Sequence, residues 1–324
     1  MIKHKTIFIS PLDWGLGHAT RCVPLIRRLM ADNTVILGTT PGTRTVLEEE
    51  FPGLKQVGIE PYNIRYSKTL PLLLKLFSDA PRIASVIKKE QEQLKAIVKE
   101  HAVDLIISDN RLGLYHERVE SIYITHQLKI KAGIWSAAAS RIHRRYMQKF
   151  SKVWVPDFEK RELALAGELS ENPGLDHVEY IGPLSRLDKE LKKGESTDYL
   201  VLLSGVEPQR SLLEEALCQA FRHTRKKVVF VRGTGAPRAV SFPEELTVVD
   251  LADAARLSQL VADAETIVCR SGYSSLMDLH HAQKKQLVLI PTPGQTEQEY
   301  LARHWHNRFG ARVLEQSGIA GWKP

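Results

Sequence analysis

Residues 6–21 read TIFISPLDWGLGHATR, a short apolar run followed by a glycine-rich turn and the start of a longer segment. The run Thr6–Ser10 predicts a buried strand, because β-branched and aromatic residues suit an enclosed position in a sheet. The residues after the turn predict a helix over His18–Met30. A strand, a glycine turn and a helix in this order are typical of an α/β fold with a parallel sheet.

The same order recurs along the whole chain. We expect further strands at Asn33–Gly38, Val103–Ser108, Ser121–Thr125, Lys152–Pro156, Tyr199–Leu203, Lys227–Val231, Thr247–Asp250, Thr266–Cys269 and Gln286–Ile290. We expect further helices at Gly42–Glu50, Ala80–Lys99, Leu212–His223, Ala254–Ala262, Ser274–His281 and Glu297–Asn307. The fold class is therefore α/β, with two Rossmann-like, doubly wound domains. We expect these domains to face a cleft, with ligands beyond the carboxyl ends of the strands.

The alternation of predicted strands and helices stops after residue 184, where the charged stretch Arg186–Asp198 begins. Such a stretch is typical of a linker between domains. We predict a first domain over residues 1–184, a linker over 185–198 and a second domain over 199–324.

Composition narrows the classes of function. The chain has 324 residues, of which 43% are hydrophobic and 26% charged, and this excludes a wholly disordered, collagen-like or coiled-coil chain. The net charge of +7 favours an anionic partner: the phosphates of a nucleotide, a nucleic acid or an acidic membrane surface. Neither a helix-turn-helix nor a zinc-finger spacing is present, so nucleic acid is not the expected partner.

The three cysteines, Cys22, Cys218 and Cys269, are far apart in the sequence. Their spacing fits neither a zinc site nor a disulfide framework, so we expect reduced thiols. The first residues resemble no signal peptide, and no later segment is apolar enough to span a membrane. We therefore expect a cytoplasmic protein.

Three turns carry the candidate chemistry. In the first, Gly15 and Gly17 let the backbone approach a ligand, and His18 stands where a general base can act. The third glycine of the dinucleotide fingerprint is missing. A histidine that only caps the helix is the alternative interpretation.

The second turn follows the predicted strand Thr266–Cys269. Ser271, Gly272, Ser274 and Ser275 at a helix start form a plausible cradle for a diphosphate. Asp278 lies one helical turn further on, where its carboxylate can accept ribose hydroxyls. Serines that only cap the helix, with an exposed aspartate, are the alternative.

The third turn, Pro291–Tyr300, ends a strand and gathers amides and carboxylates at a helix start. Side chains of these types suit a polyhydroxylated ligand, since every sugar hydroxyl both donates and accepts hydrogen bonds. The residues concerned are Gln295, Glu297, Gln298 and Glu299. An ordinary capping box is the alternative.

Residues of the first half suggest where an acceptor binds. Asp109 and His126 directly follow two predicted strands, so we expect both at the ligand-binding edge of the sheet. Thr69–Phe77 is unusually apolar, and Ile130–Phe150 mixes apolar residues with cations, as amphiphile-binding and membrane-binding surfaces do. A core helix with a solvated basic edge is the alternative for the second segment.

Taken together, the three turns resemble those of GT-B glycosyltransferases, most closely the family 28 group that includes the peptidoglycan N-acetylglucosaminyltransferase. The resemblance covers nearly the whole chain. It implies that His18 is the general base or its close partner, and that Ser204, Gly205 and residues 271–275 lie near the diphosphate. It further implies Asp278 on the ribose, and Glu297, Gln298 and Glu299 near the sugar. Arg232 completes the expected donor site.

This sequence departs from the family pattern at three places. Asp278 stands where glutamate is commoner, the segment Val206–Arg210 lacks the Gln-Gly of the lipid II enzyme, and the sequence ends at Pro324, before the usual C-terminal helix. Contact with the ribose and closure of the domains are the features that these departures put in doubt.

The resemblance implies a metal-independent glycosyltransferase of the hexosyl or N-acetylhexosaminyl class. The expected donor is a nucleotide sugar, a UDP-sugar first, and the expected acceptor is a lipid-linked or other cell-envelope precursor met near an anionic membrane. A nucleotide-sugar hydrolase or epimerase on the same fold remains an alternative. A non-catalytic anion-binding protein is a remoter one.

Overall fold

The computed structural model describes residues 2–63, 79–188, 194–237 and 240–324 of the chain. The chain divides into two compact units, of which the first ends at Ser185 and the second begins at Arg186. We call them the N-terminal unit and the C-terminal unit. The division falls at the start of the predicted linker, and residues 189–193 of that linker lie outside the described residues.

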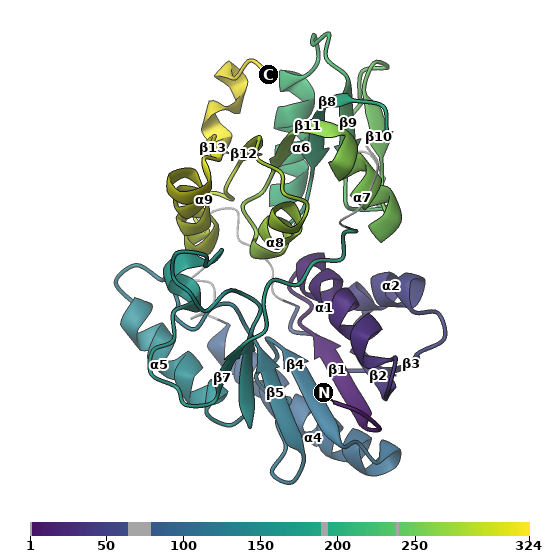
Figure 1. Cartoon of the computed structure of the whole chain (residues 1–324), viewed down its shortest axis with the longest axis vertical. Helices are drawn as coiled ribbons and strands as arrows, with labels where there is room; N and C mark the ends of the chain where they lie inside the picture. The colour runs from purple at the N-terminus through teal and green to yellow at the C-terminus, as the bar shows by residue number, and fades with distance from the viewer. Residues whose placement is uncertain (1, 64–78, 189–193, 238–239) are drawn as a thin grey trace. The chain divides into compact units, whose positions relative to one another are not determined.

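The N-terminal unit is built on a parallel sheet, which in the described residues has the order β3-β2-β1-β4-β5-β6-β7 (Figure 1). Its strands are β1 (Thr6–Pro11), β2 (Thr34–Thr39), β3 (Lys55–Gly58), β4 (Leu105–Asp109), β5 (Glu120–Ile124), β6 (Lys152–Val155) and β7 (Val178–Tyr180). Since β1 pairs with both β2 and β4, the strand order reverses at β1. In sheets of this type, ligands bind beyond the carboxyl ends of the strands at the reversal point.

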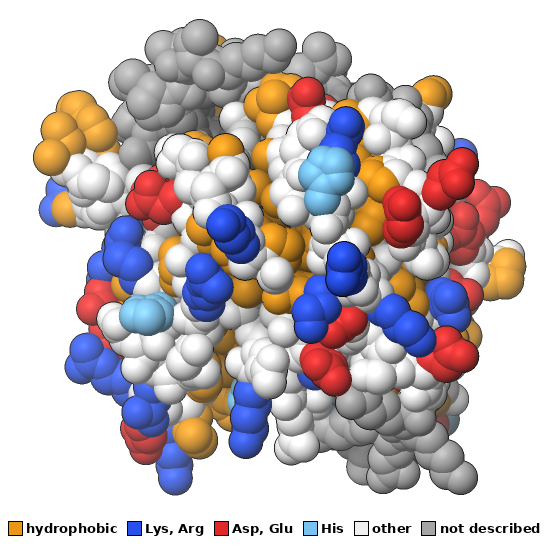
Figure 2. All heavy atoms as spheres, turned by 90° about the horizontal axis from the view of Figure 1, so that it is seen from above, with side chains coloured by type: hydrophobic (Ala, Val, Ile, Leu, Met, Phe, Trp, Pro, Cys, Tyr) orange, Lys and Arg blue, Asp and Glu red, His pale blue; other side chains and the backbone are white. Residues whose placement is uncertain are grey.

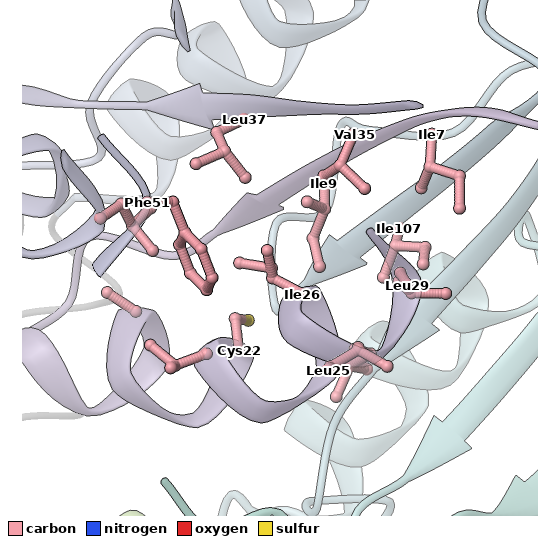
Figure 3. Packing of buried hydrophobic residues seen from close by; sticks show 14 of the residues in the cluster. Ile7, Ile9, Cys22, Leu25, Ile26, Leu29, Val35, Leu37, Phe51 and Ile107 are labelled. Atoms are coloured by element: carbon pink, nitrogen blue, oxygen red, sulfur yellow. The ribbon is translucent and has the colours of Figure 1, made fainter. Parts of the chain in front are cut away.

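Helices cover both faces of this sheet. They are α1 (Leu16–Leu29), α2 (Pro41–Glu50), α4 (Ala80–His101) and α5 (Ser136–Met147), with a short 3₁₀ helix, η1 (Gly167–Ser170). Successive strand residues point to opposite faces, so Ile7 and Ile9 of β1 share a core with Ile26 of α1 (Figure 3). Phe8, between them, shares the opposite core with Leu94 of α4. Burial on both faces explains why these strands read as continuous apolar runs.

The C-terminal unit repeats this architecture with the order β10-β9-β8-β11-β12-β13 in its described residues. Its strands are β8 (Thr197–Leu202), β9 (Val228–Val231), β10 (Thr247–Val249), β11 (Ala264–Cys269), β12 (Leu287–Leu289) and β13 (Arg312–Val313). Its helices are α6 (Gln209–Ala220), α7 (Ala254–Asp263), α8 (Tyr273–His281) and α9 (Thr296–Phe309), with the 3₁₀ helix η2 (Gln316–Gly321). Trp322 closes one face of the sheet by packing on Phe221 and Tyr199.

The two parallel sheets of Rossmann-like order confirm the predicted fold class. The cleft between the two halves stays a prediction. The three cysteines are unpaired and buried, Cys22 in the N-terminal unit and the other two in the C-terminal unit.

Charge is mixed on the surface. Figure 2 shows one face of the molecule, on which Lys and Arg side chains are interspersed with Asp and Glu. Among the described helices, none is long and apolar enough to cross a membrane.

Candidate active site

The first turn lies between β1 and α1. Gly15, the residue before the helix, has φ of 81°, a left-handed conformation that glycine adopts without steric cost. As the N-cap residue of α1, Gly15 has no side chain with which to cap the helix. The first turns of α1 carry His18, Arg21 and Cys22. These residues stand at positions i, i+3 and i+4 and so share one face of the helix.

Asp109 is the point where these side chains meet. It is the last residue of β4, next to β1 in the sheet, and its side chain is fully buried. Nε of Arg21 lies 2.9 Å from Oδ2 of Asp109, and Nη2 of Arg21 contacts Oδ1. Nδ1 of His18 lies 3.2 Å from Oδ2, and Sγ of Cys22 donates to the same oxygen at 3.5 Å.

His126 completes the cluster from the segment that follows β5, the next strand in the sheet. Its Nδ1 lies 3.3 Å from Nη1 of Arg21, and 4% of the residue is exposed. The structure thus brings together the three predicted catalytic residues, His18, Asp109 and His126, around Arg21. We call these four residues the His18 cluster.

The charges of this cluster set the protonation of its members. Burial by itself raises the pKa of Asp109, but the positive charge of Arg21 and the hydrogen bonds from Arg21 and His18 outweigh it, so that the net pKa is lowered. Asp109 is therefore ionised. Burial, and then the charge of Arg21, lower the pKa of His18, so its neutral form predominates at neutral pH.

Nδ1 of His18 faces two groups with opposite requirements. It lies 2.8 Å from Nη2 of Arg21, which can only donate a hydrogen bond, and 3.2 Å from Oδ2 of Asp109, which can only accept one. It therefore accepts from Arg21 or donates to Asp109, one at a time. When it donates to Asp109, Nε2 carries a lone pair and can take up a proton.

A second buried network supports the loop after β1. Nε of Arg111 lies 2.7 Å from Oε1 of Glu90 on α4, and Tyr62 donates its hydroxyl to Oε2 of the same carboxylate at 2.8 Å. Asp13, in the first turn, accepts the backbone N–H of Tyr62 at 3.2 Å. Burial raises the pKa of Glu90, although the Arg111 charge opposes the shift.

In the C-terminal unit, the turn after β8 holds Ser204 and Gly205. Gly205 is exposed and has φ of 106°, again a conformation that favours glycine. Ser204 is half-buried beside it.

The turn before α8 gives its serines different roles. Ser271 is fully buried and donates its hydroxyl to the backbone oxygen of Gln298 at 2.8 Å. Ser274, Ser275 and Asp278 are half-buried on α8. Gly272 is the N-cap residue of α8 and has no side chain with which to cap the helix.

The third turn, before α9, is held mainly by its own side chains. Oε1 of Gln298 accepts the N–H of Thr292 at 2.8 Å, and Oε1 of Glu299 accepts the N–H of Gly294 at 2.9 Å. Gln295 and Glu297 are half-buried in the same turn. Ser271, Gln298 and Glu299 thus shape the loops internally, which their sequence positions do not reveal.

Arg232, expected in the donor site, belongs to an ionic network. It is 1% exposed, its Nε lies 2.5 Å from Oε1 of Glu214, and its Nη1 lies 2.7 Å from Oδ1 of Asp250. Arg210 pairs with the second oxygen of Glu214. In the described residues, no cluster of three or more His, Cys, Asp or Glu side chains is arranged to hold a metal ion.

One comparison concerns the C-terminal unit alone. Residues 199–321 match the family model of the glycosyltransferase family 28 C-terminal domain. The matched residues include all the predicted donor-site residues except Gly15 and Gly17. No curated protein sequence matches the chain.

Comparison with solved structures extends the similarity to both units. The glycosyltransferase of kitacinnamycin superimposes with a TM-score of 0.69 at 16% identity, covering 100% of this chain and 88% of that one. The spinosyn rhamnosyltransferase SpnG gives 0.65 at 12% identity, covering 98% and 90%. MurG of Acinetobacter baumannii gives 0.56 at 12% identity, covering 99% and 89%. At these identities the comparison establishes the GT-B glycosyltransferase fold.

Two of the similar structures hold nucleotides. SpnG has been solved with thymidine diphosphate and with spinosyn aglycone, and the glycosyltransferase VinC has been solved with dTDP.

Proposed function

We propose that this protein transfers a sugar from a nucleoside-diphosphate sugar to a hydroxyl acceptor. The observation that carries the proposal is the family 28 domain, in a chain whose N-terminal unit presents a buried histidine–carboxylate cluster at its ligand-binding strand ends. Complexes of SpnG and VinC with thymidine diphosphates support a nucleoside-diphosphate donor.

In the proposed reaction, Nε2 of His18 accepts the proton of the acceptor hydroxyl. The hydroxyl oxygen bonds to the anomeric carbon while the bond from that carbon to the diphosphate oxygen breaks. The nucleoside diphosphate leaves with the bonding electron pair. Asp109 accepts the Nδ1 hydrogen of His18 and balances the imidazolium charge, as a carboxylate does in other base-activating pairs. Arg21 keeps Asp109 ionised through the cycle.

The proposed donor site needs no metal ion. Developing charge on the diphosphate is met by the positive end of the α8 dipole and by the hydroxyls of Ser274 and Ser275. Asp278 takes the ribose, and Gln295 and Glu297 take the sugar hydroxyls. A UDP-sugar is the expected donor, and a dTDP-sugar is the second candidate.

The first experiment is a thermal-shift panel of nucleoside diphosphates and nucleotide sugars, run without metal and then with Mg²⁺. A ligand at about 100 times its Kd adds roughly 2.7 kcal/mol of stability. Stabilisation without metal supports the donor site, whereas no stabilisation by any nucleotide contradicts it. Donor that is consumed in the absence of acceptor indicates the hydrolase alternative.

The general base is tested by His18→Ala. Loss of a general base lowers turnover by roughly 10²–10⁴-fold, while nucleotide binding stays near that of the wild type, because the proposed donor site lies in the other unit. His126→Ala is the matched control, a second buried histidine of the same cluster, and should cost less. Unchanged turnover in His18→Ala removes this residue from the mechanism.

We further propose an amphiphilic acceptor that is met at an anionic membrane. Ile134 is 91% exposed, Trp135 49% and Ile142 52%, all within or just before α5. The exposed Arg141 and Arg145 lie on the same helix. Exposed apolar side chains beside cations fit the surface of an anionic bilayer. The apolar segment Thr69–Phe77, also expected on the acceptor side, lies outside the described residues.

The membrane proposal is tested by sedimentation with vesicles. Binding to vesicles of phosphatidylcholine with phosphatidylglycerol, and not to phosphatidylcholine alone, is the expected result. The double variant Ile134→Ser, Trp135→Ser should lose this binding. Leu212→Ser, a change at an exposed leucine of the C-terminal unit, should keep it. Equal binding by all three proteins contradicts the proposal.

A further inference from the structure

Glu90 and Arg111 form a fully buried ion pair in the N-terminal unit. Oε1 of Glu90 lies 2.7 Å from Nε of Arg111. The other oxygen, Oε2, accepts the hydroxyl of Tyr62 at 2.8 Å and the backbone N–H of Gly113 at 2.9 Å. Glu90 lies in the middle of α4, and the proposed reaction does not use it.

Two of these partners hold one side chain in the turn between β1 and α1. Nη1 of Arg111 lies 3.5 Å from Oδ1 of Asp13, and the backbone N–H of Tyr62 donates to the same oxygen at 3.2 Å. Nη1 of Arg111 also donates to the backbone oxygen of Pro11 at 3.4 Å. One carboxylate, that of Glu90, therefore fixes both groups that converge on Oδ1 of Asp13.

This turn decides where α1 begins and so where His18 lies. The pairing of β1 with β4 ends at Pro11, opposite Asp109, so the turn from Asp13 onward lies outside the sheet. His18 is in the first turn of α1, and the ends of helices fray. Arg21 lies one turn further along and is held on Asp109 by its own ion pair. A loosened turn would therefore displace His18 before it displaces Arg21.

We infer that Glu90 is a positioning residue for His18. Through its two partners it holds Asp13 in place, and the turn then keeps Nδ1 of His18 on Oδ2 of Asp109. Among the described residues, no hydrogen bond joins Glu90 directly to the His18 cluster, so its action is indirect. This inference rests on the proposed role of His18 as general base and adds a remote residue on which that role depends.

Displacement of His18 from the cluster has a signature that needs no substrate. Burial and then the positive charge of Arg21 lower the pKa of His18, and His126 adds to the lowering, while Asp109 opposes it. A His18 side chain that moves into solvent loses the effect of burial, which is the largest, so its pKa rises toward the ordinary value. A change that only destabilises the unit leaves the pKa of His18 in the folded protein as it is.

The test is an NMR pH titration of the histidine ring signals, with isotope-labelled histidine, in the wild type and in Glu90→Gln. Glutamine has the size of glutamate but only one acceptor oxygen. Arg111 and Gly113 can only donate, and they face different oxygens of Glu90, so one of them loses its partner. The spectrum of His18→Ala assigns the His18 signal.

Asp157→Asn is the matched control. Asp157 is another fully buried carboxylate of the N-terminal unit, and it accepts the backbone N–H groups of Leu165 and Ala166. Its loss should destabilise the same unit without loosening the turn between β1 and α1.

We expect the pKa of His18 to rise in Glu90→Gln and to keep its wild-type value in Asp157→Asn. In assays of sugar transfer, kcat should fall about 10–10²-fold in Glu90→Gln, the cost of a misplaced catalytic group, while the Kd for UDP stays within about twofold. An unchanged pKa of His18 in Glu90→Gln overturns the inference, and so does an equal rise in both variants.

Two further outcomes are distinguishable. If Glu90→Gln does not fold, Asp13→Ala decides, because it removes the side chain through which Glu90 acts and leaves the buried ion pair in place. A wild-type pKa of His18 in Asp13→Ala then overturns the inference. If the wild type binds no nucleotide, the proposed function fails, while the titration still decides whether Glu90 positions His18.

Discussion

At the scale of single residues, Arg21 determines how the His18 cluster behaves. It contacts Asp109, His18 and His126 at once, and so links three elements of the N-terminal unit. Its positive charge lowers the pKa of Asp109 and of His18. Asp109 therefore stays ionised, and His18 stays neutral. A neutral His18 is what a general base requires.

The pH profile of turnover tests this role. A base acts only when it is neutral, so activity falls as the pH drops through the pKa of His18, which burial and the Arg21 charge hold below its ordinary value. Arg21→Gln removes the positive charge, leaving Asp109 and His126 as the charged or titratable groups facing His18. The acidic limb of kcat/KM should therefore move to higher pH.

Arg21→Lys is the matched control, since lysine keeps the charge and should leave the limb near its wild-type position. An identical acidic limb in all three proteins would mean that Arg21 does not tune His18.

The residue scale also shows what could be predicted from sequence at the site. Asp109 and His126 were predictable because polar residues that directly follow apolar strands converge at one sheet edge, and His18 because it follows the glycine turn after β1. Arg21 was visible in the first turn, three residues after His18, yet its charge could not be assigned without the position of Asp109. Glu90 gave no signal, because it lies mid-helix and its partners come from distant loops.

At the scale of elements, the strands with long buried apolar runs were predicted, and the short strands with few buried side chains were missed. β3, β7 and β13 lie at or near sheet edges and are short, with few buried side chains, so their sequences lack the strand pattern. A helix within residues 130–150 was one of two interpretations of that segment, and its bounds were not predicted, because α5 carries alanine, serine and arginine and buries only Met147. The core strands β1, β4 and β11 bury both faces and read clearly.

Gly38 of β2 is required by close packing at the element scale. A Cβ built there would lie 2.5 Å from Cζ of Phe8 and 2.7 Å from Cβ of Ser10 on β1. Gly38→Ala should therefore lower the free energy of unfolding by about 1–3 kcal/mol through overpacking. Gly58→Ala on β3, where nothing lies within 4 Å, should change it by less than about 0.5 kcal/mol.

Urea unfolding of the two glycine variants gives the comparison. Equal stability of Gly38→Ala and Gly58→Ala would show that β1 and β2 can separate at no cost, contrary to the tight packing described.

The helix α8 carries the predicted ribose contact. Asp278 lies one turn after Ser274, and Asp278→Ala should weaken nucleoside-diphosphate binding about tenfold, the cost of losing hydrogen bonds to a charged group. Asp278→Glu tests whether a longer side chain also reaches the ribose, since the family that this sequence resembles has glutamate at this position. Calorimetric titration with UDP measures both variants. UDP binding to Asp278→Ala as tight as that of the wild type would refute the ribose assignment.

At the scale of the whole molecule, the net charge of +7 is compatible with nucleic-acid binding. The distribution of charge on the surface does not favour that function. Cations and anions are mixed on the face in Figure 2, and Arg210, Arg232 and Arg270 of the C-terminal unit are buried. We expect nucleotide affinity to fall only slightly between about 50 and 200 mM salt, whereas a binder with 6–10 phosphate contacts loses about 10³–10⁵-fold.

Fluorescence titration with labelled duplex DNA and with a labelled nucleoside diphosphate at several salt concentrations separates the two behaviours. Tight duplex binding with a steep salt slope, alongside no nucleotide binding, would favour the anion-binding alternative over the glycosyltransferase.

The buried cysteines make the two units separately observable. Burial raises the pKa of Cys22 in the N-terminal unit, and that of Cys269 in the C-terminal unit to about 12, so neither is a reactive thiolate while its unit is closed. Alkylation by iodoacetamide then proceeds only through local or global opening. Mass spectrometry of the labelled peptides would time the opening of each unit within one molecule, with no engineered probe.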